Sequence, residues 1–535
     1  MSSTSAYGSR RVALAWLVLS ALALAGLYWW WAIGQPVSLP DAPSARIACV
    51  SYAPFRQPGE TPLNPKAFIS PERIDADLRV LSQRFDCVRT YSQGQGLSAV
   101  PQIAERYGMK VLLGIWLGGD RKANEQQIKL GIATAREYPQ VLRGVIVGNE
   151  VLLRGDLSAQ QLTGYLHEVR AAVTVPVTYA DVWEFWMRHP ELANSVDFIT
   201  IHILPYWEDK PVSPEHAVQH VAAVYAKVQK AFPGRRVMIG ETGWPSAGRP
   251  RQAASASVVN EARYLREFLR YAATVHMPYN VIEAFDQPWK RDQEGTAGGY
   301  WGIYDAQARP KFALQGPVIE EPHWWLGWLG ALAGAVLFVL VGLPRRHWKG
   351  WRGWLTLGLA GLASGSALAW QFRQMWFACR NPGEWTVSLL VCGVALLTAL
   401  RLACWLAARL SGLSPAMVVA LRWRLGWLFG LAYYGLLLVF DGRYRDFPLG
   451  LFMLPCIGLA LVGCLAGRQQ RPMPRLEARF LSLCLPLLAL AVLVQEAWLT
   501  PVAWSWMGLN LLLALPVWLD WRAARAGAPV GLQSQ

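Results

Sequence analysis

Long apolar segments are the feature that most restricts how this chain can fold. One covers residues 12–33, and seven more follow residue 322, at about 324–343, 353–371, 386–407, 425–440, 447–466, 480–499 and 501–519. A helix needs about 20 apolar residues to cross a bilayer. Eight such segments predict a membrane protein in which an N-terminal anchor and a C-terminal bundle flank a polar domain.

The first apolar segment is expected to remain in the protein. Arg10 and Arg11 precede it, and the aromatic run Tyr28-Trp29-Trp30-Trp31 closes it, as aromatic residues do at membrane interfaces. Its apolar run is longer than that of a cleaved signal peptide. We therefore expect an uncleaved anchor.

Basic residues are distributed unevenly along the chain. Residues 41–321 contain 31 Lys and Arg against 30 Asp and Glu, whereas the remainder contains 20 basic and 6 acidic residues. A nucleic-acid-binding protein would carry its basic excess on the folded domain, so this function is not expected. Basic residues outside a globular domain are typical of loops beside membrane spans.

The loop charges also predict an orientation. With the N-terminus in the cytoplasm, sixteen of these twenty basic residues fall on the cytoplasmic side, and only Arg373, Arg380, Arg443 and Arg445 fall outside. Cytoplasmic loops carry the excess of Lys and Arg. The polar domain is therefore expected outside the cytoplasm, which is the periplasm if the cell is a Gram-negative bacterium. The chain is then expected to be a multi-pass protein of the bacterial inner (plasma) membrane.

These patterns together predict six regions. They are a cytoplasmic N-terminus (1–11), a transmembrane anchor (12–33), a linker rich in Pro, Ser and Ala (34–45), the polar domain (46–321), a membrane domain of about seven helices (322–520) and a cytoplasmic tail (521–535).

The polar domain alternates short apolar runs with stretches of helical length. The apolar runs are 47–52, 86–91, 110–117, 144–149, 175–180, 198–203, 237–240 and 279–285. Eight strands with helical connections over a domain of this size predict an α/β fold of the (β/α)8 TIM barrel class, beside an all-α polytopic membrane domain. An open doubly wound sheet is the alternative, but it would normally carry a Gly-rich phosphate turn after its first strand.

Two of the predicted strands end in carboxylates. "GVIVGNEV" places Glu150 just after the fourth strand, and "VMIGETGWPSAG" places Glu241 at the end of the seventh. Strand ends meet at the mouth of a barrel, where active sites form. Two carboxylates about 5–5.5 Å apart are what retaining glycoside cleavage needs, one as acid/base and one as nucleophile.

Aromatic residues gather at the predicted strand ends, as expected of a sugar cleft. An individual Trp is more often a packing residue, but so many at strand ends favour a binding role. The residues expected to bind substrate are Tyr52, Arg89, Tyr91, Trp183, His202, Tyr206, Trp207, Trp244, Glu283 and Trp289.

The motifs "VGNEV" and "GETGWPSAG", followed by "EAFDQPWK" and "GYWGIYD", resemble glycoside hydrolase family 17, the β-1,3-glucanases and glucanosyltransferases. This resemblance covers residues 45–316. It implies that Glu150 is the acid/base, that Glu241 is the nucleophile and that Asn149 contacts the sugar 2-hydroxyl. Gln287 stands where the fungal pattern carries an acid. An anchor, a family 17 domain and a multispan tail together resemble bacterial proteins of the β-(1→6) glucan synthase type.

The resemblance implies a membrane-bound enzyme acting on β-1,3-glucan or its oligosaccharides outside the cytoplasm. We expect transfer that forms branched or cyclic β-1,3/β-1,6-glucan, because a covalent intermediate conserves glycosidic-bond energy where sugar nucleotides are absent. The alternatives are hydrolysis by an endo- or exo-β-1,3-glucanase, and an inactive glycan-binding or export scaffold. No cofactor and no metal are expected, and a glucan-polymerising synthase is a candidate partner.

Only Cys49 and Cys87, among eight cysteines, lie in the polar domain. Side chains alternate between the two faces of a strand. If Tyr52 and Tyr91 both point toward the barrel mouth, Cys87 points inward and Cys49 points outward. The two thiols would then lie on opposite faces, so we expect no disulfide between them.

Overall fold

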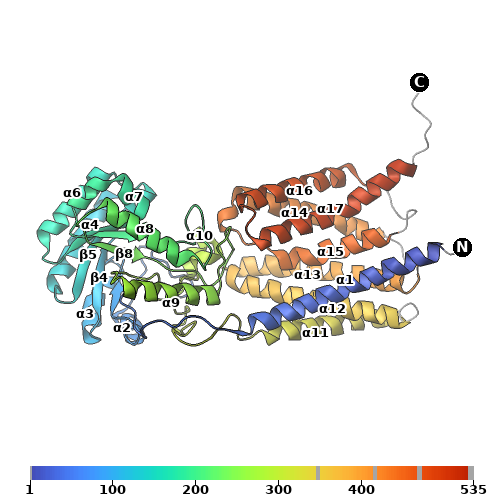
Figure 1. The fold of residues 1–535 in the computed structure, drawn as a ribbon, viewed down its shortest axis with the longest axis horizontal. Coiled ribbons are helices and arrows are strands. Elements are labelled where there is room, and N and C mark those ends of the chain that lie inside the picture. Colours follow the sequence, from blue (N-terminus) through green and yellow to red (C-terminus); the bar gives the residue numbers. More distant parts are fainter. Residues whose placement is uncertain (1–2, 345–349, 414–417, 467–472, 528–535) are drawn as a thin grey trace, which may run out of the picture. The chain divides into compact units, whose positions relative to one another are not determined.

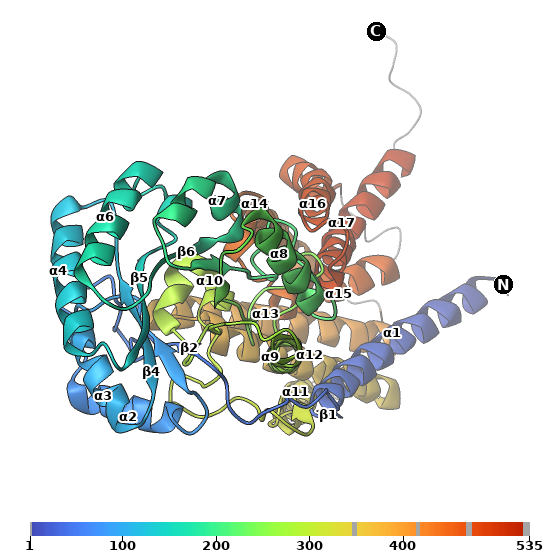
Figure 2. The ribbon, with the colours of Figure 1, turned by 60° about the vertical axis from the view of Figure 1, so that its left-hand side comes forward.

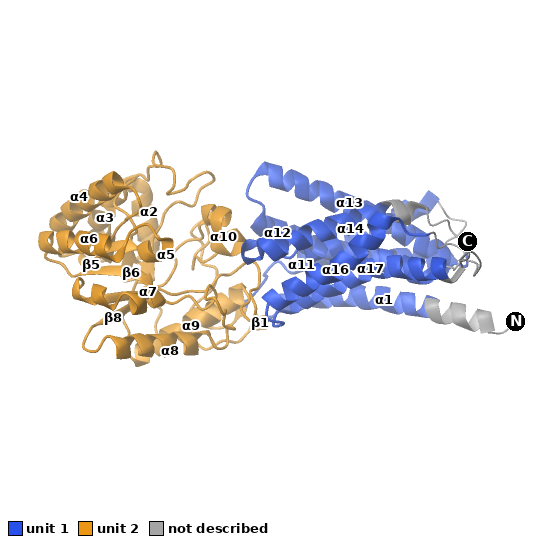
Figure 3. Cartoon of the chain, turned by 90° about the horizontal axis from the view of Figure 1, so that it is seen from above, with its two compact units in different colours: residues 1–35, 319–535 blue, residues 36–318 orange. Residues whose placement is uncertain are grey.

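The computed structural model of this protein describes residues 3–344, 350–413, 418–466 and 473–527. The chain divides into two compact units, residues 36–318 and residues 1–35 with 319–535 (Figure 3). The predicted basic stretches around 345–349 and 467–472, and the predicted tail from residue 528 onward, lie outside the described residues.

The unit formed by residues 1–35 and 319–535 is helical. Each predicted apolar segment overlaps one of its helices, which are α1 (Ser3–Ile33), α11 (Trp325–Gly342), α12 (Gly350–Ala378), α13 (Pro382–Leu410), α14 (Val418–Phe440), α15 (Leu449–Leu465), α16 (Leu476–Gln495) and α17 (Pro501–Gly527) (Figure 1). Six of these helices in the described chain are long and apolar enough to cross a membrane, namely all except α12 and the shorter α15. This indicates a membrane protein.

Helices α11 and α12 approach each other through glycines. A Cβ atom on Gly334 would lie 2.3 Å from the carbonyl oxygen of Gly361, and one on Gly365 would lie 2.1 Å from that of Gly330. Small residues allow such backbone contact in membranes, where packing rather than water exclusion holds helices together.

The other unit is built around a curled parallel sheet. Its strand order is β2 (Val50–Ser51), β3 (Cys87–Arg89), β4 (Lys110–Ile115), β5 (Leu142–Asn149), β6 (Val177–Val182), β7 (Ile199–His202) and β8 (Val237–Glu241). Two further short strands, β1 (Pro36–Val37) and β9 (Val318–Ile319), lie near the limits of the unit. The predicted TIM-type α/β fold is confirmed.

The predicted eighth strand, residues 279–285, closes the sheet through separate bridges and is not a regular strand. Val281 bridges to Val50 of β2, and Tyr279 bridges to Ile239 of β8. The amide of Ser51 donates to the carbonyl of Val281 at 2.9 Å, and the amide of Asn280 donates to that of Ile239 at 2.8 Å. This segment therefore joins both edges of the sheet.

Helices surround the sheet (Figure 2). They are α2 (Pro71–Leu81), α3 (Val100–Arg106), α4 (Arg121–Glu137), α5 (Val151–Arg154), α6 (Ala159–Ala172), α7 (Trp183–Arg188), α8 (Ala217–Ala231), α9 (Val258–Thr274) and α10 (Arg291–Gly298). Side chains cap the N-termini of several. Ser158 forms a capping box with Gln161 before α6, and Asp120 and Ser257 accept amide hydrogens at the starts of α4 and α9.

The prediction of two free thiols in this unit is wrong, because Cys49 and Cys87 form a disulfide. Val50 pairs with Val88, so the cysteines one position earlier lie opposite each other on the same face. They pack inside the barrel with other inward strand residues, including Leu112, Ile146 and Met238.

The wrong prediction came from the assumption that Tyr52 points toward the barrel mouth. Its side chain points outward, where its hydroxyl donates to Asp77 of α2 at 2.9 Å. Val50 also points outward, so Cys49 and Ser51 point into the barrel. A one-residue error in register exchanges the two faces of a strand.

Candidate active site

Glu150 and Glu241 face each other at one end of the sheet. Glu150 follows β5, and Glu241 is the last residue of β8. One carboxylate oxygen of each, together with a ring nitrogen of His202 from the end of β7, lie within 4.8 Å of one another. The side chain of Glu150 is partly exposed and that of Glu241 is buried. A substrate can therefore reach Glu150 from solvent, whereas Glu241 lies deeper in the site.

The chain turns sharply to present Glu150. The backbone of Glu150 has a φ of 52° and that of Gly148 has a φ of 81°, both in the left-handed region. Such a conformation is costly for a residue with a side chain and occurs often at functional sites. The amide of Glu150 donates to the carbonyl of Ala180 at 2.8 Å. The carboxylate of Asp181 accepts hydrogen bonds from the backbone amides of Leu152 and Leu153. These bonds fix the start of α5.

The carboxylate of Glu241 is held by three groups inside the barrel. Its Oε1 accepts hydrogen bonds from Nη1 of Arg89 at 3.0 Å and from the hydroxyl of Tyr91 at 2.8 Å. Burial alone would raise the pKa of Glu241, but His202 and Arg89 outweigh it and hold the pKa below its usual range. Glu241 is therefore ionised at neutral pH, as a nucleophile must be.

Arg89 also fixes Asn149. Its Nη2 donates to Oδ1 of Asn149 at 2.5 Å, while its Nη1 donates to the carbonyl of Gly240 at 2.8 Å. Because Oδ1 accepts from Arg89, the amide NH2 of Asn149 is oriented away from the guanidinium as a donor. Arg89 thus connects the two strand ends that carry the acids.

His202 bridges the two carboxylates. Its Nδ1 lies 3.0 Å from Oε1 of Glu150 and 3.7 Å from Oε2 of Glu241, and the ring is fully buried. Carboxylate and imidazole atoms this close are also potential metal ligands. However, Nδ1 is already engaged with Glu150, and Arg89 already neutralises charge at Glu241. This donor set suits proton sharing better than metal ligation.

A buried ion pair lies beside the acids. Nζ of Lys290 contacts both carboxylate oxygens of Glu283 at 2.9 Å. Burial raises the pKa of Glu283 to about 7, against the opposing charge of Lys290. Lys290 also helps to lower the pKa of Glu241. Burial raises the pKa of Glu294, and the charges of Glu150 and Glu241 add to that increase.

The predicted aromatic residues differ in their positions. Tyr91 contacts Glu241, whereas Tyr52 lies on the outer face of the sheet and does not reach the acids. Tyr206 and Trp244 are buried, and each donates a hydrogen bond to a backbone carbonyl, that of Arg249 and that of Ser255. These two residues support the loops that follow β7 and β8.

Three predicted tryptophans are partly exposed. The ring of Trp207 stacks on that of Trp301 at 6.3 Å. The indole of Trp289 donates to Gln287 at 2.8 Å, and Nζ of Lys227 lies 4.3 Å from the ring centre of Trp183. These three are the tryptophans among the predicted binding residues that keep exposed surface.

The sequence interpretation missed several residues of this site. The hydroxyl of Ser51 accepts a hydrogen bond from Asn280 and lies 2.9 Å from the hydroxyl of Tyr91, so it supports the group that contacts Glu241. Lys290 and Glu294 lie on the 3-10 turn Pro288–Lys290 and on α10, outside the repeating strand pattern. The lysine in "EAFDQPWK" was a visible signal, because a cation close to buried acids usually pairs with one of them.

Two opposed carboxylates at the strand ends of a barrel are the arrangement that glycoside hydrolases use. Residues 49–302 match the sequence profile of the BtgE/BtgC glycoside hydrolase domain.

Curated relatives align with the same part of the chain. A glucan 1,3-beta-glucosidase of Arthroderma benhamiae is 26% identical over 258 residues, covering 45% of this chain and 83% of the relative. A glucan 1,3-beta-glucosidase of Schizosaccharomyces pombe is 27% identical over 245 residues, covering 43% of this chain and 76% of the relative. The crystal structure of a family 17 beta-1,3-glucanosyltransferase from Rhizomucor miehei is 26% identical, covers 50% of this chain and 98% of its own, and gives a TM-score of 0.45.

Proposed function

We propose that this protein is a membrane-bound, retaining glycosidase and transglycosylase of β-1,3-glucan. The approach of one oxygen of Glu150 and one of Glu241 within 4.8 Å carries the proposal, because it suits a retaining pair and leaves little room for the water of an inverting site. The relatives named as glucan 1,3-beta-glucosidases support the substrate class.

In the first step, the ionised Glu241 attacks the anomeric carbon of a β-glucosyl residue. The glycosidic C–O bond breaks, and Glu150 gives its proton to the departing oxygen. His202 Nδ1–H donating to Oε1 of Glu150 leaves Oε2 to carry that proton toward the leaving group. The step yields a covalent α-glucosyl ester on Glu241 and a shortened glucan.

In the second step, Glu150 acts as base. It takes a proton from water or from a sugar hydroxyl, whose oxygen attacks the anomeric carbon and releases Glu241. Asn149 is the residue we assign to the sugar 2-hydroxyl, because Arg89 orients its amide as a donor. The β configuration is restored in either case.

We favour transfer to a sugar hydroxyl over hydrolysis. The domain is placed, in this proposal, on the outer side of a bacterial inner membrane, where nucleotide sugars are absent. There, a covalent intermediate is the available store of glycosidic-bond energy. Transfer to a 6-hydroxyl would form branched or cyclic β-1,3/β-1,6-glucan, and a polymerising synthase in the same membrane is the partner we expect.

Product analysis separates transfer from its alternatives. The full-length protein in detergent is incubated with reduced and unreduced laminari-oligosaccharides, and products are followed by mass profile and linkage analysis. Transfer predicts products longer than the substrate and new 1,6 linkages. Glucose and short oligosaccharides alone would indicate hydrolysis instead.

A nucleophile variant provides the control. Glu241→Gln is expected to remove all product formation, because the amide cannot attack the anomeric carbon. An inactive wild-type protein that still bound laminari-oligosaccharides would support the glycan-binding scaffold and contradict the enzyme proposal.

A further inference from the structure

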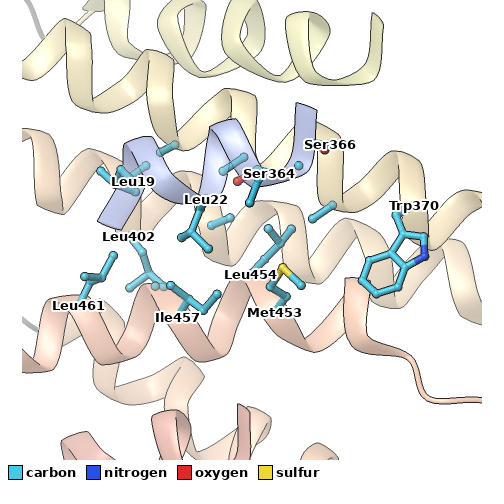
Figure 4. A pocket seen from close by; sticks show the side chains of 18 of the residues that line it. Leu19, Leu22, Ser364, Ser366, Trp370, Leu402, Met453, Leu454, Ile457 and Leu461 are labelled. Carbon is cyan, nitrogen blue, oxygen red and sulfur yellow. The ribbon is translucent and has the colours of Figure 1, made fainter. Parts of the chain in front are cut away.

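The helical unit contains an apolar cavity of about 330 Å³ between α1, α12, α13 and α15 (Figure 4). Leu19 and Leu22 of α1, Leu402 of α13, and Met453 and Ile457 of α15 point into it. Every lining residue belongs to this one unit.

The lining excludes polar occupants. Apart from three indoles, the described residues that line the cavity have only two polar side chains, those of Ser364 and Ser366. The indole NH of Trp30 is already bonded to the carbonyl of Ser366. A buried water needs two to four polar partners, and apolar cavities stay dry. A sugar would leave its hydroxyls unsatisfied, so a hydrocarbon is the suitable occupant.

The dimensions of the cavity suit one leaflet of a bilayer. Its lining on α1 runs from Leu19 to Trp30, which is about 16 Å at 1.5 Å per helical residue. This is roughly half of the ~30 Å hydrocarbon core of a membrane. Trp29, Trp30 and Trp370 close one end, and indoles favour the membrane interface. The cavity thus runs from the interface toward the middle of the bilayer.

Charges of both signs lie just beyond that end. Arg373 follows Trp370 by about one turn of α12. Its Nε lies 2.7 Å from Glu321 and its Nη2 lies 3.6 Å from Glu320, with all three side chains partly exposed. A guanidinium matches a phosphate, and carboxylates match an ammonium group. This combination suits a zwitterionic headgroup better than an anionic one.

We propose that this cavity binds one acyl chain of a zwitterionic phospholipid, with phosphatidylethanolamine chemistry at the headgroup. The chain lies along α1 and α15, and the headgroup lies at the Arg373 end. The protein would then hold a specific lipid in the leaflet nearer Ile33, in addition to its general contact with the bilayer.

Photolabelling of the full-length protein in lipid nanodiscs tests this proposal. The probe is phosphatidylethanolamine with a diazirine in one acyl chain, and labelled peptides are mapped by mass spectrometry. Labelling of residues 19–30 and 453–461 is expected to exceed that of the exposed face of α11 at least fivefold. Equal labelling of the two regions would overturn the proposal.

Two variants sharpen the result. Ala363→Phe fills the cavity and is expected to reduce cavity labelling at least fivefold, whereas Ala333→Phe adds the same bulk to an exposed position of α11 and should leave it unchanged. Cavity labelling that persists in a folded Ala363→Phe protein would contradict the site. If that variant does not fold, the wild-type map decides alone.

Competition with unlabelled lipids tests which kind of hydrocarbon the cavity binds. Excess unlabelled phosphatidylethanolamine should reduce the cavity labelling, and excess farnesyl phosphate should not. Competition by the prenyl phosphate alone would overturn the assignment to an acyl chain.

Discussion

Nη1 of Arg89 lies 3.0 Å from Oε1 of Glu241, and both side chains are almost completely buried. A carboxylate in such a position would be protonated without a neighbouring positive charge. His202 and Arg89 together therefore keep Glu241 ionised, and the contact of Arg89 with Asn149 connects the ends of β5 and β8.

Loss of this charge is expected to move the pH profile. In Arg89→Gln, the pKa of Glu241 should rise, because burial remains while an opposing charge is removed. The acidic limb of kcat/KM should move to higher pH by about 1 unit or more, as expected for an opposite charge within hydrogen-bonding distance. The profile is measured on a laminari-oligosaccharide.

The pH dependence of folding stability should shift in the same direction as the kcat/KM profile. A lowered pKa of Glu241 adds stability above the unfolded-state pKa, and this stability is lost as the pH falls through the folded-state value. Arg89→Gln reduces that contribution at neutral pH, because one of the groups that lower the pKa of Glu241 is lost. Arg121→Gln is the control, because the Arg121 side chain is highly exposed. An acidic limb that does not move in Arg89→Gln would contradict the role given to Arg89.

His202 should influence the chemical step more than substrate binding. His202→Leu removes the hydrogen bond to Glu150 and is expected to lower kcat about 10²-fold, the lower range for loss of acid–base catalysis, with little change in KM. His202→Asn, whose amide NH2 can occupy the place of Nδ1, should retain more activity. Steady-state kinetics distinguish these results from a binding role, in which KM would rise and kcat would persist.

Thiol counting tests the corrected register of β2. In the described structure Cys49 and Cys87 form a disulfide, and the other six cysteines are thiols, namely Cys379, Cys392, Cys404, Cys456, Cys464 and Cys484. The full-length protein should therefore show six thiols under denaturing, non-reducing conditions and eight after reduction. Replacing both Cys49 and Cys87 by Ser should cost about 2–4 kcal/mol of stability. Eight thiols before reduction would show instead that Cys49 and Cys87 are not bonded, as the sequence had predicted.

Reporter fusions test the orientation derived from the basic loops. Fusions at residue 300 and within 371–384 should report an external location. Fusions at 347, 412, 472 and the C-terminus should report the cytoplasm, although 347, 472 and the last eight residues lie outside the described structure. A cytoplasmic signal at residue 300 would contradict the compartment on which the transfer proposal depends.

The sequence was sufficient for features that repeat. Apolar runs of strand length, each followed by a helix, predicted the barrel, and their ends located Glu150 and Glu241. The face of a short strand was harder to predict. β2 has only two residues, so no alternation within it showed that Tyr52 packs against Asp77 and not at the mouth.

Contacts between distant segments were also beyond the sequence. Arg89 of β3 reaches Asn149 and Glu241 only because the sheet curls until these strands face one another. Lys290 approaches Glu283 through a turn outside the strand and helix repeat, so periodicity gave no indication of its partner. Such pairs depend on tertiary geometry, and local propensity does not determine them.

The stereochemistry of the first product tests the central claim most directly. The wild-type protein is given a laminari-oligosaccharide, and proton NMR follows the anomeric proton of the residue released from the enzyme. After transfer this proton lies in the new glycosidic bond, and after hydrolysis it lies at a new reducing end, which is read before mutarotation equilibrates it. A double displacement through Glu241 predicts the β anomer as the first product. Initial formation of the α anomer would show inversion and contradict the retaining mechanism proposed for Glu150 and Glu241.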